Sequence, residues 1–284
     1  MNIFTNKQRV LFITGIISIL LLAACSNENS SNDSSDTEKS TTAWDEIQEE
    51  GSLTVATSGT LLATSYHDTT SNELTGFEVE VVREVAKRLD LEIEFKEMGF
   101  DEMLTSVQTG QVDIAANDIE ITEDRAENFI FSTPFKHSYG IAVVRKDDLS
   151  GIKTLEDVKG KKAAGASTSI YMQIAREHGA EEVTYDNASN EIYLRDVSIG
   201  RTDVILNDFY LSSLGVNAFP DLNITIHPDI KYSPSKVGFV MNTENKELEE
   251  NVNRVIEEML EDGTITKLST QFFNADVSYE ADIE

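Results

Sequence analysis

An arginine stands at a position where helix electrostatics disfavour it. Thr122 is a good N-cap for a short helix, because its side-chain oxygen can accept a backbone N–H from the first turn. Glu123 and Asp124 suit the positive end of such a helix, whereas Arg125 does not. A carboxylate bound at the helix start beside the guanidinium would explain the arginine, since both groups attract anions. The simpler alternative is a surface arginine on a loop.

Polar side chains precede this arginine in the sequence. Residues 112–116 are apolar enough for a buried strand, and Asn117, Asp118 and then Glu120 follow its carboxyl end. In doubly wound α/β sheets, ligands bind beyond the carboxyl ends of the strands. Asp118 and Glu120 could alternatively form a carboxylate pair for acid–base catalysis. The four histidines show no metal-ligand spacing, and no G-x-S-x-G motif is present, so binding is favoured over catalysis.

The chain repeats the segment that leads to these residues. Residues 107–118 read VQTGQVDIAAND, and residues 197–208 read VSIGRTDVILND, with Val, Gly, Asp, Asn and Asp shared. Each copy has the pattern of a helix end, a glycine stop and a strand that leads to Asn-Asp. The repeat predicts two similar lobes, which would form one cleft if these strand ends face each other.

The hydrophobic pattern alternates between strands and helices in both halves of the chain. The predicted strands are residues 52–57, 91–95, 112–116, 162–166, 183–185 and 202–206. The predicted helices are residues 45–50, 76–89, 101–109, 154–158, 170–178, 187–200, 246–260 and 265–273. This order is the signature of doubly wound α/β sheets. Two isolated β runs, 138–145 and 237–242, are candidates for strands that cross between the lobes and form a hinge.

The N-terminus has the pattern of an exported lipoprotein. Lys7 and Arg9 precede an apolar run, residues 10–22, which is too short to span a bilayer comfortably. Leu-Ala-Ala-Cys follows and ends at Cys25, the only cysteine of the chain. We expect residues 1–24 to be a signal peptide, Cys25 to be lipid-modified, and residues 25–43 to be a disordered tether. A plain signal peptide with a chance cysteine is the alternative.

The net charge limits the classes of partner. The formal charge of the 284-residue chain is −28, and removal of Lys7 and Arg9 with the signal peptide lowers it to −30. Such a charge argues against nucleic-acid binding and against adhesion to anionic lipid. The simplest interpretation is a soluble, acidic surface, which carries no information about the ligand.

The sequence motifs resemble one family from residue 55 to residue 273. The matching stretches are LTGFEVEVVREVAKRL, IEITEDR, FSTPF, LEDVKGKK, GRTDVILND and EDGTITKLSTQFF. They resemble the amino-acid-binding proteins of ABC importers, bacterial extracellular solute-binding protein family 3. Within that family, the sequence of these motifs is most similar to that of the cystine-binding lipoproteins of Gram-positive bacteria.

The resemblance implies a fold and a division of the chain. It implies an α/β, periplasmic-binding-protein-like fold of type II, in which two crossover strands join two doubly wound lobes and the ligand binds in the interlobe cleft. We expect residues 44–140 to form the first part of lobe 1 and residues 141–236 to form lobe 2. Residues 237–284 would then contain the return segment of lobe 1 and an acidic tail with little to bury.

The resemblance also implies roles for individual residues. Arg125 would pair with the α-carboxylate of the ligand, helped by backbone N–H groups at Thr168 and Ser169. Asp208 would bind the α-ammonium, and Phe100 would flank the ligand. The full predicted ligand-binding set is Ser58, Phe100, Asn117, Asp118, Glu120, Arg125, Thr168, Ser169 and Asp208.

Two departures from the family bear on the ligand. Residues 61–64 replace an aromatic-Pro-Pro-aromatic stretch, which favours a longer or sulfur-containing side chain lying on aliphatic groups. Asp118 and Glu120 stand where many relatives have Gly and Thr, which favours a ligand with a second ammonium. L-Cystine fits both departures, and glutamine, arginine and histidine are alternatives.

The expected function is therefore transport. We expect a monomeric protein, lipid-anchored on the extracellular face of the cell membrane, that delivers an amino acid to the permease subunits of an ABC importer. No metal, cofactor or nucleic acid is expected. A dehydratase-type enzyme on the same fold is the less favoured alternative.

Overall fold

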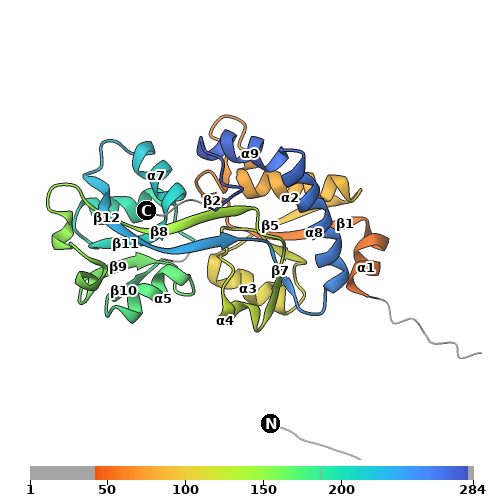
Figure 1. The fold of residues 1–284 in the computed structure, drawn as a ribbon, viewed down its shortest axis with the longest axis horizontal. Helices are drawn as coiled ribbons and strands as arrows, with labels where there is room; N and C mark the ends of the chain where they lie inside the picture. Colours follow the sequence, from red (N-terminus) through yellow and green to blue (C-terminus); the bar gives the residue numbers. More distant parts are fainter. Residues whose placement is uncertain (1–41, 186, 281–284) are drawn as a thin grey trace, which may run out of the picture. The chain divides into compact units, whose positions relative to one another are not determined.

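Two five-stranded sheets, with helices on both faces of each, carry most of the described chain (Figure 1). The computed structural model describes residues 42–185 and 187–280, all within one compact unit. The predicted signal peptide and Cys25 lie outside these residues. Within the described ranges, no helix is long and apolar enough to cross a membrane.

The first sheet has the strand order β5-β1-β6-β13-β7. Its strands are β1 (Ser52–Thr57), β5 (Glu92–Glu97), β6 (Ile114–Ala115), β7 (Phe129–Phe131) and β13 (Val240–Asn242). β1 pairs in parallel with β5 and β6, and β13 runs antiparallel to β6 and β7. The sheet therefore has a parallel half, formed by consecutive units of the chain, and an antiparallel half, completed by a late segment.

Helices cover both faces of the first sheet because neighbouring strand residues point to opposite sides. Val55 belongs to the core formed with α1, α2, α8 and α9, whereas Ala56 belongs to the core formed with α3. These helices are α1 (Ala43–Glu50), α2 (Phe77–Arg88), α3 (Phe100–Gln108), α8 (Lys246–Glu261) and α9 (Thr264–Phe273). We call this sheet, these helices and the short helix α4 (Glu123–Ala126) the first lobe.

The second sheet has the strand order β10-β9-β11-β8-β12. Its strands are β8 (Lys136–Arg145), β9 (Lys162–Gly165), β10 (Glu181–Thr184), β11 (Val204–Asp208) and β12 (Ile224–Val237). Val144 faces the core formed with α5 (Ile170–Glu177), and Val143 faces α6 (Asn190–Ser198) and α7 (Phe209–Ala218). Two 3₁₀ helices, Leu149–Gly151 and Leu155–Val158, precede β9. We call this sheet and its helices the second lobe.

The structure bears out the internal repeat. In each copy a helix, α3 or α6, ends at a glycine with positive φ, 70° at Gly110 and 76° at Gly200. In each copy an aspartate then accepts a backbone N–H from the neighbouring parallel strand. Asp113 accepts from β1 at 2.8 Å, and Asp203 accepts from β9 at 3.0 Å. The two copies therefore bring β6 and β11 to equivalent places in their sheets.

The strands that run between the lobes differ from the prediction. β8 and β12 pair antiparallel from Arg145 opposite Ile224 to Lys136 opposite Val237, and they lie side by side in Figure 1. Residues 237–242 are not one continuous strand as predicted: Val237 ends β12 in the second sheet and Val240 begins β13 in the first, so the chain passes between the sheets within this run. Pro228 and Pro234 obscure the alternation of β12, but an edge strand tolerates proline.

Two ends of the folded region also differ from expectation. α1 begins at Ala43, two residues earlier than predicted, because Thr42 and Asp45 form a capping box. The tail was expected to bury little, and this is wrong for Val277, which is fully buried and accepts the His137 N–H at 2.8 Å through its carbonyl. The tail therefore packs where the chain enters β8.

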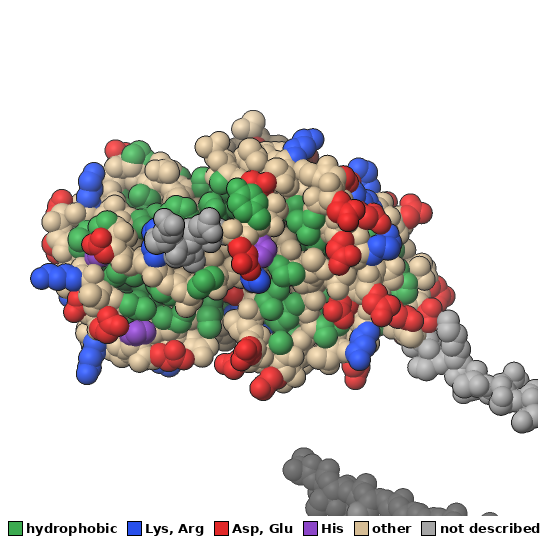
Figure 2. Space-filling view, viewed as in Figure 1, with side chains coloured by type: hydrophobic (Ala, Val, Ile, Leu, Met, Phe, Trp, Pro, Cys, Tyr) green, Lys and Arg blue, Asp and Glu red, His purple; other side chains and the backbone are tan. Residues whose placement is uncertain are grey.

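A small antiparallel sheet precedes α2, and acidic side chains are spread over much of one face of the molecule (Figure 2). The three-stranded sheet β2 (Thr60–Leu61), β3 (Ser65–His67) and β4 (Leu74–Thr75) follows β1 and leads into α2. On the face shown in Figure 2, acidic side chains are spread widely and are dense around α1 and α8. These two helices carry part of the large negative charge away from the lobe contacts described below.

Candidate ligand-binding cleft

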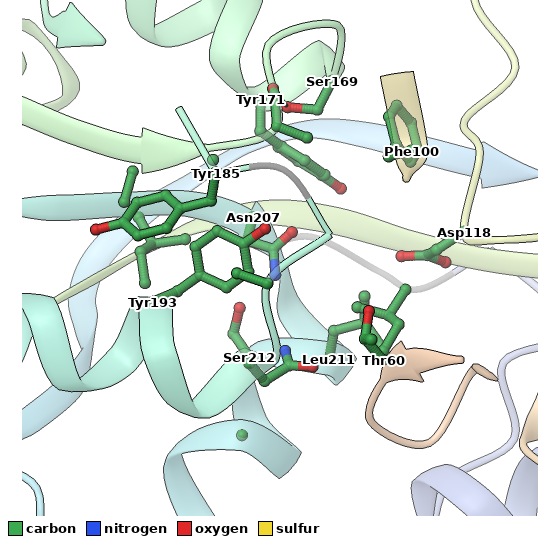
Figure 3. Close-up of a pocket in the computed structure, with 18 of the residues that line it drawn as sticks. Thr60, Phe100, Asp118, Ser169, Tyr171, Tyr185, Tyr193, Asn207, Leu211 and Ser212 are labelled. Atoms are coloured by element: carbon green, nitrogen blue, oxygen red, sulfur yellow. Dashed lines mark hydrogen bonds between the residues drawn. The ribbon is translucent and has the colours of Figure 1, made fainter. Parts of the chain in front are cut away.

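A cavity of about 140 Å³ is lined by residues from both lobes. The first lobe contributes Ser58, Thr60, Leu61, Phe100, Asn117, Asp118 and Glu120. The second lobe contributes Ser169, Tyr171, Tyr185, Tyr193, Asn207, Leu211 and Ser212, among others. In Figure 3, Phe100 and Asp118 lie at one end of the cavity and the two tyrosines Tyr185 and Tyr193 at the other.

The predicted site residues gather around this cavity in two groups. Six of them line it directly: Ser58, Phe100, Asn117, Asp118, Glu120 and Ser169. The other three, Arg125, Thr168 and Asp208, are not among its lining residues. Arg125 bonds to the lining residue Glu120 and Asp208 to Leu211, whereas Thr168 bonds to Arg125 and Asp101. Asn117 fixes the loop after β1, because its Oδ1 accepts the Ser58 N–H at 3.1 Å.

Arg125 joins the two lobes. Thr122 caps α4 as predicted, accepting the Arg125 N–H at 3.2 Å. The guanidinium donates to the Glu120 carbonyl at 2.8 Å, to the Glu120 carboxylate at 3.3 Å and to the Thr168 carbonyl at 3.2 Å. Its Cζ lies 5.9 Å from the centre of the Phe100 ring. These bonds use Nη1 and Nη2, and Nε makes no hydrogen bond to the described residues, so one edge of the guanidinium is open to a planar anion.

The N–H groups predicted to help bind a carboxylate have partners within the protein. Thr168 donates both its N–H and its hydroxyl to Asp101 Oδ1, at 3.0 and 2.6 Å. The Ser169 N–H donates to the Ala166 carbonyl at 3.2 Å, and Ser169 Oγ caps α5 by accepting the Met172 N–H. Ligand contact through these two N–H groups would require the Asp101 or Ala166 bond to open.

A buried lysine that the sequence analysis did not single out links the two copies of the repeat. Lys136, the first residue of β8, has its Nζ 2.5 Å from Asp118 Oδ1 and 3.0 Å from Asp208 Oδ2. Its side chain is fully buried. Asp208 also caps α7, because its Oδ1 accepts the Leu211 N–H at 2.8 Å. The sequence held a signal for this burial, because Lys136 and Ser138 lie on the same face of a strand that is buried along most of its length.

Glu78 is a second buried ionisable residue that was missed. Its Oε1 accepts the Asp118 N–H at 2.8 Å, where Asp118 has a φ of 57°. Its Oε2 is buried without a hydrogen-bond partner among the described residues. Helical spacing could have revealed it, because position 78 shares a face with Val82 and Val85. A neutral carboxyl suits this site, because one oxygen accepts a single backbone N–H and the other oxygen is buried with no donor to stabilise a negative charge.

The buried charges are out of balance. The carboxyls of Glu78, Asp118, Glu120 and Asp208 lie with only two cations, Lys136 and Arg125. Burial, together with the nearby Asp118 carboxylate, raises the pKa of Glu78 well above its ordinary value. Burial also raises the pKa of Asp118, to about 7, against the opposing effect of Lys136. With Glu78 neutral, the carboxyls of Asp118, Glu120 and Asp208 face two cations, so a further positive group nearby would favour the ionised form of Asp118.

Lys136 itself is held in its charged form. Burial alone would lower the pKa of Lys136, but the carboxylates of Asp118 and Asp208 outweigh burial and raise the pKa above its ordinary value. The lysine is therefore a permanent counter-ion for the strand ends of both lobes.

The far end of the cavity offers uncharged hydroxyl and amide groups among apolar side chains such as Leu194 and Ile205. Ser212 Oγ is buried and has no hydrogen-bond partner among the described residues. Asn207, Tyr185 and Tyr193 lie around the same end, with the two tyrosine rings packed edge to face at 4.8 Å. The acidic side chains among the described lining residues are Asp118 and Glu120. A ligand that reaches Ser212 therefore meets hydroxyl and amide groups there.

Further hydrogen bonds close the cleft at its rim. Thr60 Oγ1 donates to Asn187 at 3.1 Å, and the Leu62 N–H donates to Asn190 at 3.0 Å. Together with the Arg125–Thr168 and Thr168–Asp101 bonds, they hold the lobes in contact on both sides of the cavity. No group of three or more His, Cys, Asp or Glu that could bind a metal occurs in the described ranges.

Comparison with known proteins identifies the family. Residues 53–275 match the model of bacterial extracellular solute-binding proteins, family 3. The chain belongs to this family. It is 60% identical to the probable ABC transporter extracellular-binding protein YckB of Bacillus subtilis (strain 168), over 100% of this chain and 98% of YckB. A crystal structure of YckB matches with a TM-score of 0.68 and 64% identity, over 86% of this chain and 98% of that chain.

Two other similar proteins are named for the amino acid that they bind. The L-cystine-binding protein TcyA of Bacillus subtilis (strain 168) is 34% identical, over 96% of this chain and 99% of TcyA. An ancestral arginine-binding protein bound to arginine has a TM-score of 0.71 and 30% identity, over 78% of this chain and 98% of that chain. This solute-binding protein therefore has the predicted type II periplasmic binding fold, and it is an amino-acid ABC transporter component and not an enzyme.

The neutral state of Glu78 predicts a pH effect on stability. A carboxyl with a raised folded pKa contributes most to stability below its unfolded pKa, and the contribution is lost as pH rises through the folded pKa. Glu78→Gln keeps the acceptor for the Asp118 N–H but cannot ionise. We expect the unfolding free energy of the parent, relative to Glu78→Gln, to fall from pH 5 to pH 8, by up to about 1.4 kcal/mol per pH unit.

Urea denaturation at the two pH values measures this difference. Glu250→Gln, on the exposed face of α8, removes one surface charge and serves as the control, with the pH dependence of the parent. Equal pH dependence in the parent and Glu78→Gln would show that Glu78 does not titrate with a raised pKa.

Proposed function

We propose that this protein captures L-cystine outside the cell and delivers it to the permease of an ABC importer. The observation that carries the proposal is the asymmetry of the cavity, which has ionised groups at one end and neutral hydrogen-bonding groups at the other. An elongated amino acid with a second polar head of no net charge is complementary to both ends.

The charged end is proposed to bind one zwitterionic head. The free edge of the Arg125 fork would hold the α-carboxylate in a bidentate pair, stacked beside Phe100. The surplus negative charge of Asp118, Glu120 and Asp208 over the two cations favours the α-ammonium nearby. Asn117 and Ser58 shape the wall of the cavity on the first-lobe side.

The uncharged end supports cystine over arginine. A guanidinium at the far end would need a carboxylate, and the acids among the described lining residues are both at the other end. The second head of cystine is itself a zwitterion, so the side chains of Ser212 and Asn207 can bind it without a fixed counter-charge. The 34% identity to a protein named for L-cystine agrees with this choice, although a protein named for arginine is similarly related.

The anchoring of the protein is a separate proposal. Leu-Ala-Ala-Cys after a charged and then apolar N-terminus supports export and lipid modification at Cys25. The folded lobes would then stand on the extracellular face of the membrane, within reach of the permease.

The ligand is tested by calorimetry of protein lacking residues 1–25. We expect L-cystine to bind with a micromolar or lower Kd, and L-arginine to bind at least ten-fold more weakly because its guanidinium lacks a carboxylate at the far end. L-Glutamine and L-histidine complete the panel. Arg125→Ala should weaken cystine binding by roughly 2–5 kcal/mol, because the ligand carboxylate would be buried unpaired.

Two results would overturn this proposal. One is tight binding of arginine with no heat from cystine. The other is undiminished cystine binding by Arg125→Ala, which would remove that residue from the site. A folded state shown by the far-ultraviolet spectrum of the variant is the necessary control.

Ser212 reports on the second head. Ser212→Ala removes one hydrogen bond at the far end, worth about 0.5–1.5 kcal/mol, and should weaken cystine binding by about 2- to 12-fold. S-Methyl-L-cysteine has only one head, so its affinity should not change. The matched control is Ser213→Ala, whose hydroxyl donates within α7 to the Phe209 carbonyl. An equal loss for both ligands would contradict a two-headed ligand in this cavity.

The lipid anchor is tested in cells of a Gram-positive host. The full chain should sediment with membranes and incorporate labelled palmitate, and Cys25→Ser should do neither and should appear in the medium or in the unprocessed form. Palmitate incorporation by Cys25→Ser would disprove lipid modification at this residue.

A further inference from the structure

Lys136, the first residue of β8, is fully buried between two carboxylates. Its ammonium lies 2.5 Å from the Asp118 carboxylate of the first lobe and 3.0 Å from the Asp208 carboxylate of the second. The ring centre of Phe273 lies 5.5 Å from the same nitrogen. One cation thus meets the strand ends of both copies of the repeat at the point where the lobes join.

Closure of the cleft would be opposed without this lysine. Asp118 and Asp208 follow or end the equivalent strands β6 and β11, so closing the lobes brings two carboxylates to one buried point. Glu120, also buried, adds a third carboxylate nearby. Lys136 begins β8 and pairs with Val237 at the end of β12, where the chain returns to the first sheet.

The charge count links this lysine to the choice of ligand. Above the pKa of Asp118, the carboxylates of Asp118, Glu120 and Asp208 exceed the cations Lys136 and Arg125 by one, which matches the single α-ammonium of an amino-acid head. Without it the excess would be two, and a ligand with a further cationic group would become favourable. The lysine therefore occupies the place that a second ligand ammonium would take.

We propose that Lys136 is a specificity-determining residue, a built-in counter-ion that makes the cleft select amino acids without net charge and reject those with a net positive charge. This inference deepens the proposed function and rests on it for the amino-acid class of the ligand. It does not depend on which neutral amino acid is bound.

Lys136→Ala tests the selection, because it removes the charge and leaves space for a ligand ammonium. Calorimetry at pH 8 compares L-glutamine and L-cystine, which carry little net charge, with L-ornithine and L-arginine, which are cationic. We expect the parent to prefer the neutral class. In Lys136→Ala the ratio of the best cationic to the best neutral affinity should rise at least ten-fold.

A double variant separates charge from damage to the fold. Lys136→Ala/Asp118→Asn removes one cation and one carboxylate together, so the charge excess returns to that of the parent. We expect it to recover the preference for neutral ligands. An unchanged ratio in Lys136→Ala, or a double variant that behaves like the single one, would overturn the proposal.

A measurement without amino acid keeps the inference apart from the proposed function. n-Propylammonium has the atoms that Lys136→Ala lacks, so its chloride should raise the melting temperature of that variant more than sodium chloride at equal concentration. The parent should show no such difference. If no amino acid binds any variant, the proposed function fails, and rescue by propylammonium alone would still support the counter-ion. Absence of rescue in that case would overturn it.

Discussion

The pairing of Lys136 with Asp118 and Asp208 connects the parts on which the cleft depends. Burying an ion costs several kcal/mol unless close partners compensate, and here one ammonium serves two carboxylates that are both nearly inaccessible to water. Each carboxylate has a second structural task. Asp208 caps α7, and Asp118 follows β6 in a left-handed conformation that Glu78 stabilises through the backbone N–H. The start of β8, the start of α7 and the carboxyl ends of β6 and β11 therefore share one buried interaction.

The cleft above this interaction is divided by charge. Arg125, Glu120 and Asp118 create an end at which opposite charges are available for a zwitterion, while Ser212 and Asn207 offer uncharged partners at the other end. In the proposed function, this division would let the side-chain end change without altering the end that binds the amino-acid head.

Much of the architecture was predictable, for local reasons. The repeat located β6 and β11, the N-cap at Thr122 was readable from residue type, and six of the nine predicted site residues line one cavity. β12 was missed because two prolines interrupt its alternation, and Val277 because a lone apolar residue in an acidic tail gives no periodic signal. The domain boundaries and the roles of individual ligand-binding residues stay predictions.

The sequence by itself determined most of the elements, the repeat and an arginine at a helix start, because caps, glycine stops and hydrophobic spacing act over a few residues. Only the tertiary structure decided which charges meet. Lys136 and Asp208 are 72 positions apart, and Glu78 and Asp118 are 40 apart. Whether such groups pair, or one stays neutral, depends on distances of a few ångströms and on burial. Distance and burial are both set by the packing of distant segments, and the local sequence pattern of each segment does not specify that packing.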